Sequence, residues 1–157
     1  MFGLFKKSFE LVAPVSGPVI PLSEVPDEVF AQKLAGDGVA IDASSDIIVA
    51  PCDATLSLIF KTNHAFALTT DNGLELLVHI GIDTVGLNGE GFERLAEEGT
   101  KVTAGTPIIK INREFIKSKG LSLVTPVLIT NPDSCKEIIG LTGKTVVAGE
   151  DTVVKYK

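Results

Sequence analysis

The stretch Leu74–Phe92 reads LELLVHIGIDTVGLNGEGF and contains one of the two histidines of the chain. Apolar residues alternate along it up to His79, which is the period of a strand with one buried face. Small and turn-forming residues follow directly, among them Gly81 and Asp83, so the strand is expected to end beside the histidine. This position lets the imidazole ring of His79 reach solvent at the end of a strand.

The second histidine lies fifteen residues earlier, in another alternating run, KTNHAFAL. If the two strands are neighbours, His64 and His79 can face each other. Thr62 lies two residues before His64, on the same strand face, so its hydroxyl can orient the ring. Imidazole accepts and releases a proton or a phosphoryl group near neutral pH. We therefore expect one imidazole to be a nucleophile and the other to stabilise the charged group that it carries.

Length and charge limit the classes of protein. A chain of 157 residues with 45% apolar residues indicates one domain with a substantial core. We expect it to span residues 10–157, after a short N-terminal tail of residues 1–9. A net charge of -6 without a basic stripe argues against nucleic-acid binding and favours a basic partner.

The cysteines and the hydropathy pattern indicate the compartment. Cys52 and Cys135 stand far apart without a CxxC motif, as is typical of free thiols in a reducing cytosol. At the start of the chain, MFGLFKKSFE, the apolar stretch after the two lysines is too short for a signal peptide. No stretch approaches the roughly 20 apolar residues of a membrane span.

Short β-branched runs separated by Gly, Pro, Asp and Asn predict many short strands. Their regular spacing favours an all-β fold, an antiparallel β-sandwich or barrel, with a few short helices. The predicted strands are Val12–Ile20, Val39–Ile41, Ile47–Val49, Ala54–Phe60, Ala65–Thr69, Leu74–Ile80, Thr106–Ile111, Leu121–Ile129 and Val153–Tyr156. The predicted helices are Asp27–Leu34, Phe92–Glu98, Arg113–Lys119 and Pro132–Ile139. The last has the clearest signals, with Asn131 as N-cap, Pro132 at the first helical position and Gly140 after its end.

A faint internal repeat indicates a duplicated β motif. The run GTKVTAGTPIIK at 99–110 matches GKTVVAGEDTVVK at 143–155, apart from one extra residue. Similarly, APVSG at 13–17 resembles APCDA at 50–54, and each leads into a predicted strand. We interpret these matches as one motif folded back on itself, and not as two domains.

Three other kinds of site have little support. The run GLTGKT at 140–145 looks like the end of a P-loop, but Ile138 stands where that motif needs a glycine. No GxSxG motif occurs, which argues against a hydrolase. His64, His79 and Asp83 lack an HExxH motif or a cysteine pair beside them, which disfavours a built-in zinc site. The histidine pair remains as the candidate site.

These residues resemble the glucose-type IIA component of the bacterial phosphoenolpyruvate-dependent sugar phosphotransferase system. The similarity covers nearly the whole chain, and VHIGIDTVGLNGEGF is its most specific part. The supporting runs are APVSG at 13–17, VPD at 25–27 with Phe30, GDGVAI at 36–41, VAP at 49–51, TNHA at 62–65, and TPV at 125–127 with Asn131. The resemblance implies a duplicated hybrid barrel-sandwich motif.

The resemblance also implies roles for the central residues. His79 matches the family's phosphorylated histidine, which takes the phosphoryl group on Nε2 from phosphorylated HPr. His64 matches the partner histidine needed to pass that group to the cysteine of the IIB domain. Thr62 matches the threonine that orients this partner, and Gly81 matches the residue whose carbonyl holds the other nitrogen of His79.

Around this centre the resemblance implies a docking surface. Asp27 and Asp83 match acidic residues that meet arginines on HPr. An apolar recess for the donor would be formed by Phe30, Ile41, Phe60 and Ile80. No arginine lies near either histidine in sequence, which suits a carrier that must release its phosphoryl group.

The resemblance thus implies a cytoplasmic phosphotransferase component that acts transiently at the inner face of the cell membrane and requires no cofactor. Two alternatives to this function stay open. The first is a mainly regulatory protein, since relatives bind and inhibit sugar permeases or glycerol kinase. In such complexes a zinc ion can join His64 and His79 to a partner's glutamate. The second is a biotinyl or lipoyl carrier, which the glycine repeat resembles, but no lysine here occupies the required hairpin tip.

Overall fold

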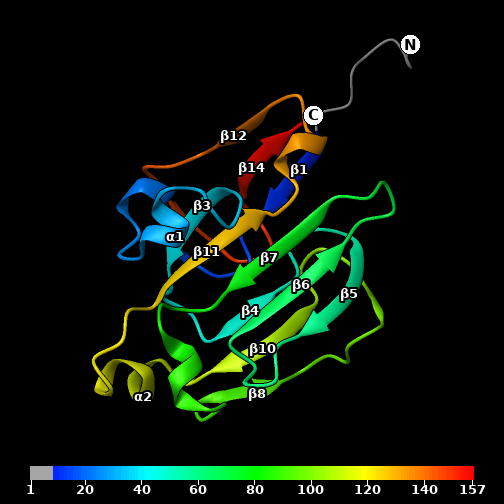
Figure 1. Cartoon of the computed structure of the whole chain (residues 1–157). Coiled ribbons are helices and arrows are strands. Elements are labelled where there is room, and N and C mark those ends of the chain that lie inside the picture. Colours follow the sequence, from blue (N-terminus) through cyan, green and yellow to red (C-terminus); the bar gives the residue numbers. More distant parts are fainter. Residues whose placement is uncertain (1–8) are drawn as a thin grey trace.

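The computed structural model describes residues 9–157, and antiparallel strands are its main regular structure (Figure 1). The strands are β1 (Phe9–Val12), β2 (Gly17–Pro21), β3 (Asp37–Asp42), β4 (Ile47–Val49), β5 (Ala54–Ile59), β6 (Ala65–Thr69), β7 (Glu75–His79), β8 (Phe92–Arg94), β9 (Lys101–Val102), β10 (Pro107–Ile111), β11 (Val124–Ile129), β12 (Ile138–Gly140), β13 (Thr145–Val146) and β14 (Thr152–Tyr156). The helices are α1 (Glu28–Ala31) and α2 (Arg113–Ser118), with 3-10 helices η1 (Leu22–Glu24), η2 (Thr84–Leu87) and η3 (Pro132–Ser134). The predicted all-β class with a few short helices is confirmed.

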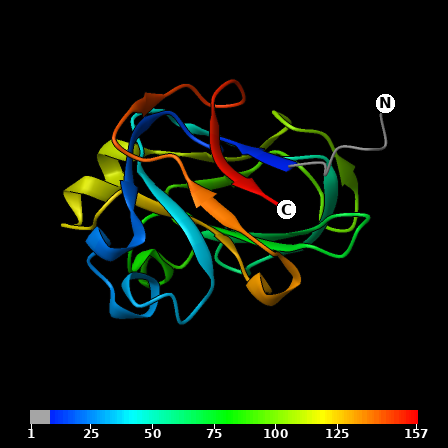
Figure 2. The same ribbon diagram turned by 90° about the horizontal axis from the view of Figure 1, so that it is seen from above.

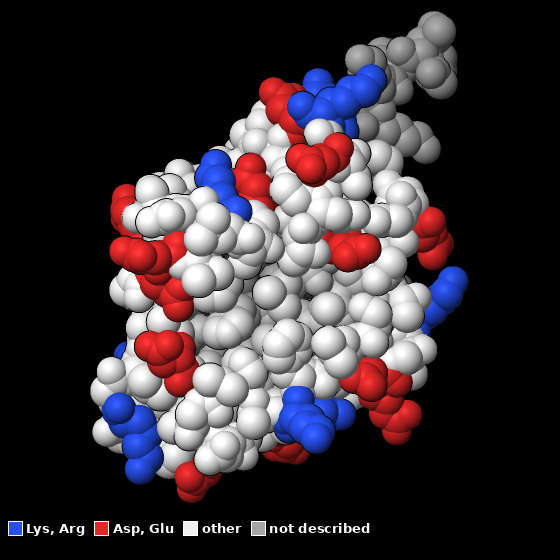
Figure 3. Space-filling model, in the orientation of Figure 1, with Lys and Arg blue, Asp and Glu red and all other residues white. Residues whose placement is uncertain are grey.

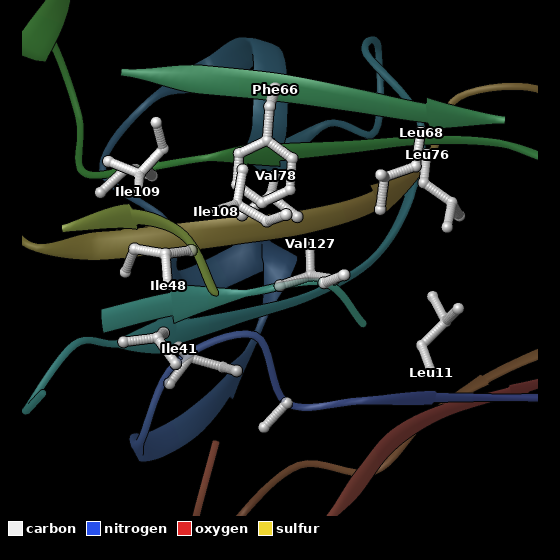
Figure 4. Close-up of a cluster of buried hydrophobic side chains, with 14 of the residues drawn as sticks. Leu11, Ile41, Ile48, Phe66, Leu68, Leu76, Val78, Ile108, Ile109 and Val127 are labelled. Atoms are coloured by element: carbon white, nitrogen blue, oxygen red, sulfur yellow. The ribbon is translucent and has the colours of Figure 1, made fainter. Parts of the chain in front are cut away.

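The strands form three sheets around a shared core. The largest has the order β13-β2-β3-β11-β7-β6-β5-β9, and the smaller ones have the orders β4-β10-β8 and β1-β14-β12. Figure 2 shows β14 beside β1, where Tyr156 pairs with Phe9. In the core, Figure 4 shows the Phe66 ring extending from β6 towards Val78 and Ile108, and all three side chains are fully buried.

A second, smaller apolar cluster lies on the other face of the large sheet. It packs η1 and α1 against β3 and β11 and consists of Leu22, Val25, Phe30, Ala40, Ile82 and Leu128. Alternate strand residues point to opposite faces, so Ala40 belongs to this cluster while its neighbours Val39 and Ile41 face the main core. The cluster places α1 beside the end of β7, where His79 lies.

The predicted duplication appears as reciprocal backbone hydrogen bonds. The segments before β2 and β5 cross, because the Val12 amide donates to the Pro51 carbonyl at 2.9 Å and the Val49 amide donates to the Pro14 carbonyl at 2.7 Å. These two bonds link equivalent positions of the repeats 13–17 and 50–54. These bonds support the predicted duplication of the β motif.

The glycine repeats make the second set of reciprocal bonds. The Gly105 amide donates to the Ala50 carbonyl, and the Gly149 amide donates to the Ala13 carbonyl, each at 2.8 Å. Both glycines have positive φ, +91° and +76°, which a residue with a side chain rarely adopts. A Cβ on Gly149 would lie 3.6 Å from the Cα of Gly105, so the two copies meet at this point.

Two predicted helices are wrong. The segment Phe92–Glu98 begins with β8, because Phe92 pairs with Ile111 and Arg94 pairs with Ile109 of β10. Pairing with a distant strand overrides the local helical pattern there. The predicted helices at α1 and α2 are present in shortened form.

The segment Pro132–Ile139 contains only the single turn η3, followed by β12. The side chain of Asn131 does not cap this turn. Its Oδ1 accepts from the Glu75 amide at 2.8 Å, and its Nδ2 donates to the Gly73 carbonyl at 3.0 Å. Because Asn131 holds the start of β7, it is not available as the N-cap that the sequence pattern predicts.

Two predicted strands differ from the structure by more than two residues. The predicted strand Val12–Ile20 is divided into β1 and β2, and the predicted strand Leu121–Ile129 begins only at Val124. The predicted N-terminal tail, residues 1–9, lies outside the described residues except for Phe9, which belongs to β1. Within residues 9–157, neither helix has the length and apolar character that a membrane span requires.

Truncation of the central aromatic side chain tests the core. Phe66→Ala is expected to lower the free energy of unfolding by about 3–5 kcal/mol, because it removes buried apolar surface and leaves a cavity. Leu58→Ala on the adjacent strand is the control, since Leu58 is 45% exposed and its loss is expected to cost about 1 kcal/mol or less. Urea unfolding followed by circular dichroism measures both, and equal losses would contradict this description of the core.

Candidate functional site

The register of β6 and β7 brings the two histidines together. Ala65 lies opposite His79 in this antiparallel pair, and the Ile80 amide donates to the His64 carbonyl at 2.7 Å. The ring centroids of His64 and His79 are 5.1 Å apart, with an angle of 82° between the ring planes. The structure thus forms the pair that the two alternating runs predict.

His64 is held almost completely inside the protein. It is 4% exposed, and its Nδ1 lies 2.6 Å from Thr62 Oγ1. The rings of His64 and Phe60 pack edge to face, with their centroids 5.4 Å apart. Burial, and next the proximity of His79, lower the pKa of His64 to about 4. The ring is therefore neutral near pH 7.

His79 is half-buried at the end of β7, and its Nδ1 is 2.8 Å from the Gly81 carbonyl oxygen. A carbonyl can only accept, so Nδ1 carries the proton and Nε2 of the neutral ring has a free lone pair. Burial lowers the pKa of His79, whereas the bond to Gly81 and the charges of Asp27 and Asp83 raise it. The arrangement supplies a neutral imidazole with Nε2 as its nucleophilic atom.

Only glycine fits at position 81. Its φ is +74°, and a Cβ there would lie 2.7 Å from Thr84 Cγ2 and 2.8 Å from the Ser122 carbonyl oxygen. Both distances are too short for a real contact with a side chain. The close packing brings the Gly81 carbonyl within reach of His79.

Two carboxylates lie close enough to act on the charge of His79. Asp27 is the N-cap of α1, and its Oδ1 accepts from the Val29 amide at 2.9 Å. Asp83 is exposed, with φ of +61°, and its side chain makes no capping bond to η2. Figure 3 shows a wide uncharged area over β7 and β11, with acidic side chains gathered along its border near α1.

The predicted apolar recess needs a correction. The Phe30 ring lies 5.0 Å from the His79 ring between centroids, and Phe60 contacts His64. Ile41 and Ile80, however, have no exposed surface, so they cannot contact a docked protein. Both side chains face the main core and support the site from beneath.

Sequence reasoning missed two exposed apolar side chains near the site. Val29 of α1 is 48% exposed, and Val85 of η2 is 54% exposed. Each lies two residues after a predicted docking aspartate, Asp27 or Asp83. An apolar residue inside a polar turn could have indicated these positions in the sequence, because exposed apolar side chains mark contact surfaces.

An arginine lies near the site although none is near it in sequence. Arg94 of β8 donates from Nε to Asn63 Oδ1 at 2.6 Å and from Nη2 to the Phe60 carbonyl at 3.4 Å. These bonds tie the turn that carries Thr62 and His64 to the sheet below it. Asn63 has φ of +60°, a conformation that asparagine tolerates better than most residues.

Residues 9–157 contain no group of three or more His, Cys, Asp and Glu side chains arranged to hold a metal ion. The site itself brings two imidazole rings together. A tetrahedral zinc ion takes four ligands, and the histidine pair supplies at most two of them.

Comparisons with known proteins agree with this geometry. A sequence family described as the phosphoenolpyruvate-dependent sugar phosphotransferase system, EIIA 1, matches residues 9–135. The chain is 49% identical to the PTS system glucose-specific EIIA component of Borreliella burgdorferi, over 85% of this chain and 72% of that protein. It is 43% identical to the component of the same name from Haemophilus influenzae, over 99% of both chains.

Longer relatives and a solved structure extend the comparison. The chain is 46% identical to the PTS system N-acetylglucosamine-specific EIICBA component of Klebsiella pneumoniae, of which it spans only 23%. The glucose permease IIA of Mycoplasma capricolum has the same fold, with a TM-score of 0.89, 35% identity and 99% coverage of both chains. From the family match and these full-length relatives, the chain belongs to the EIIA 1 family of the phosphoenolpyruvate-dependent sugar phosphotransferase system.

Proposed function

We propose that the protein is a phosphoryl carrier that accepts a phosphoryl group from phosphorylated HPr on His79 Nε2. It then gives the group to the cysteine of a glucose-type IIB domain, so that sugar uptake and phosphorylation are coupled. The observation that carries this proposal is the bond between His79 Nδ1 and the Gly81 carbonyl, which leaves Nε2 as the free nucleophile beside His64. The protein is thus a phosphotransferase component that acts through a phosphohistidine.

Acceptance needs no external acid or base. The lone pair of His79 Nε2 attacks phosphorus, a P–N bond forms, and the P–N bond of the donor phosphohistidine breaks. His79 then carries positive charge in its ring, and the Nδ1–H bond to Gly81 becomes a stronger, charge-assisted bond. Onward transfer reverses this change, because a thiolate forms a P–S bond while the Nε2–P bond breaks.

His64 stabilises the phosphoryl group on its neighbour. When the Thr62 hydroxyl donates to His64 Nδ1, the proton of the neutral ring is on Nε2, which can donate to a phosphoryl oxygen. A neutral donor holds the group less tightly than an arginine would. This suits a carrier that must release the group to its acceptor.

The surface around the site fits a partner with arginines. HPr would dock on Val29, Val85 and Phe60, with Asp27 and Asp83 at the rim of the contact, while Phe30, only 7% exposed, supports His79 from below. An apolar centre with a charged rim is typical of such interfaces. We place the protein in the cytoplasm and, during transfer to a IIB domain of a glucose-family permease, at the inner face of the membrane.

A regulatory role on the same face is the second candidate. The unphosphorylated protein would bind a permease or glycerol kinase, with a zinc ion held by His64, His79 and a glutamate of the partner. The short distance of 5.1 Å between the ring centroids favours this idea. Phosphorylation of His79 would block the metal site, because Nε2 would no longer be free.

Substitution of the two histidines is expected to block different steps of phosphoryl transfer. His79→Ala should abolish phosphorylation, whereas His64→Gln should still accept a phosphoryl group but pass it on at least about 100-fold more slowly. Incubation with phosphoenolpyruvate, Enzyme I and HPr, followed by intact mass at alkaline pH, measures acceptance, and addition of a IIB domain measures transfer. A His64→Gln protein that cannot be phosphorylated would show this division of roles to be wrong.

Charge reversal at the rim tests docking. Asp83→Arg should slow acceptance from HPr about tenfold at low salt, because it repels a basic partner, and the effect should shrink at high salt. Asp133→Arg makes the same change in charge in η3, at the far end of β7 from His79, and should leave the rate unchanged. Equal effects of both variants would remove Asp83 from the interface.

The lowered histidine pKa values predict the response to pH. Acceptance should stay nearly constant from pH 8 down to about 6.5 and then decline as the imidazoles take up protons. The free energy of unfolding should also decrease as the pH falls from about 6.5 to 4, because His64 binds a proton in the unfolded state but stays neutral in the folded state. Histidine NMR titration measures the pKa values, and urea unfolding at each pH measures the free energy of unfolding. In His64→Gln, this free energy should depend less on pH between about 6.5 and 4.

A further inference from the structure

Three polar side chains are buried within residues 9–157: His64 at 4% exposed, and Thr84 and Thr125 at 0%. Both threonine side chains bond to the dipeptide Ile80–Gly81, directly after the strand that carries the reactive histidine, and the backbone carbonyl of His64 accepts from the Ile80 amide. Burying a hydroxyl is costly unless it makes a hydrogen bond. Two buried threonines at this dipeptide therefore call for an explanation.

The first residue of the dipeptide uses both of its backbone groups. The Ile80 amide donates to the His64 carbonyl at 2.7 Å, and the Ile80 carbonyl accepts from Thr84 Oγ1 at 2.6 Å. Ile80 is 0% exposed, so solvent cannot reach its backbone to replace either bond. Removal of the Thr84 hydroxyl would leave a buried carbonyl without a partner.

The second residue is bonded in the same way. The Gly81 amide donates to Thr125 Oγ1 at 3.4 Å, and the Gly81 carbonyl accepts from His79 Nδ1 at 2.8 Å. The Thr125 hydroxyl donates its own proton to the Leu123 carbonyl at 2.9 Å, which turns its lone pairs towards Gly81. The threonine thus faces the amide of the residue whose carbonyl selects the tautomer of His79.

Glycine explains why such a restraint is needed. Position 81 must be glycine because a Cβ would collide with Thr84 Cγ2 and the Ser122 carbonyl. Glycine, however, restricts its own backbone less than any other residue. The direction of the Gly81 carbonyl is therefore set by its surroundings. The Thr84 methyl packs against its Cα face, and both hydroxyls bond to the peptide group before it. In the peptide group that contains the carbonyl, the Ile82 amide donates to the Ser122 carbonyl at 3.1 Å.

We propose that Thr84 and Thr125 are positioning residues for phosphoryl acceptance, which hold the Gly81 carbonyl against His79 Nδ1 and so direct the phosphoryl group to Nε2. The proposal deepens the proposed carrier function and rests on it. Without the hydroxyls, the dipeptide rotates and the Nδ1–H bond weakens. The tautomer with its proton on Nε2, which cannot accept a phosphoryl group there, then gains population.

Paired substitutions separate the hydroxyl from the packing. Thr84→Val and Thr125→Val keep a branched side chain and remove the hydroxyl, while Thr84→Ser and Thr125→Ser keep the hydroxyl. The valine variants should accept phosphoryl about 10- to 100-fold more slowly, and the serine variants should stay within about threefold of the natural chain. Thr84→Ala and Thr125→Ala remove the hydroxyl without added bulk and serve if a valine variant does not fold.

The decisive readout is the His79 ring itself. Nitrogen-15 NMR of the unphosphorylated proteins should show the Nδ1–H tautomer in the natural chain and a larger share of the Nε2–H tautomer in the valine variants. Thr130→Val is the matched control, because Thr130 Oγ1 donates to the Glu75 carbonyl at 3.3 Å, at the other end of the same strand. This control should change neither the tautomer nor the rate of acceptance.

The outcomes separate the two proposals. Folded valine or alanine variants with an unchanged His79 tautomer would overturn the positioning role, and so would serine variants that fail to restore the rate. If the natural chain accepts no phosphoryl group at all, the carrier function fails. The tautomer measurement does not depend on phosphorylation and would still decide whether the threonines hold the Gly81 carbonyl.

Discussion

The register between β6 and β7 is the constraint on which the site depends. Phe66 pairs with Val78 and Leu68 pairs with Leu76, and all four side chains are buried in the core. Because alternate residues point to opposite faces, this register directs the side chain of His79 outwards, beside its neighbour His64. A slip by one residue would turn the histidine into the apolar core and expose the core residues. The packing that stabilises the fold is therefore the same packing that assembles the histidine pair.

The duplicated frame holds this hairpin in place. The two copies exchange backbone hydrogen bonds at Pro14 and Pro51 and meet again at Gly105 and Gly149. Such bonds satisfy buried amides and carbonyls without side chains, so the frame tolerates substitution as long as its glycines remain. The site lies away from this crossing, on the face where α1 and η2 lie beside the strand ends.

The site combines a buried location with reactive chemistry. Burial keeps His64 and His79 neutral, which a nucleophilic nitrogen requires, while nearby carboxylates oppose this effect on His79. The Gly81 carbonyl adds direction, because it decides which ring nitrogen is free. Neutral hydrogen-bond donors around the phosphoryl group suit a reversible carrier, since a charged donor would bind the group more strongly.

The sequence by itself determined the strand-rich class, the repeated β motif and the pairing of His64 with His79 and Thr62, because these depend on short-range patterns of alternation and spacing, whereas the role of Gly81 was implied only by the resemblance to the family. The tertiary structure alone decided that Phe92–Arg94 is a strand, that Asn131 bonds to β7 instead of capping a helix, and that Ile41 and Ile80 lie beneath the surface. It also brought Thr125 and Arg94 to the site from distant strands. Each of these outcomes depends on which segments pair across long separations in the chain, and a local pattern of residues carries no information about that partner.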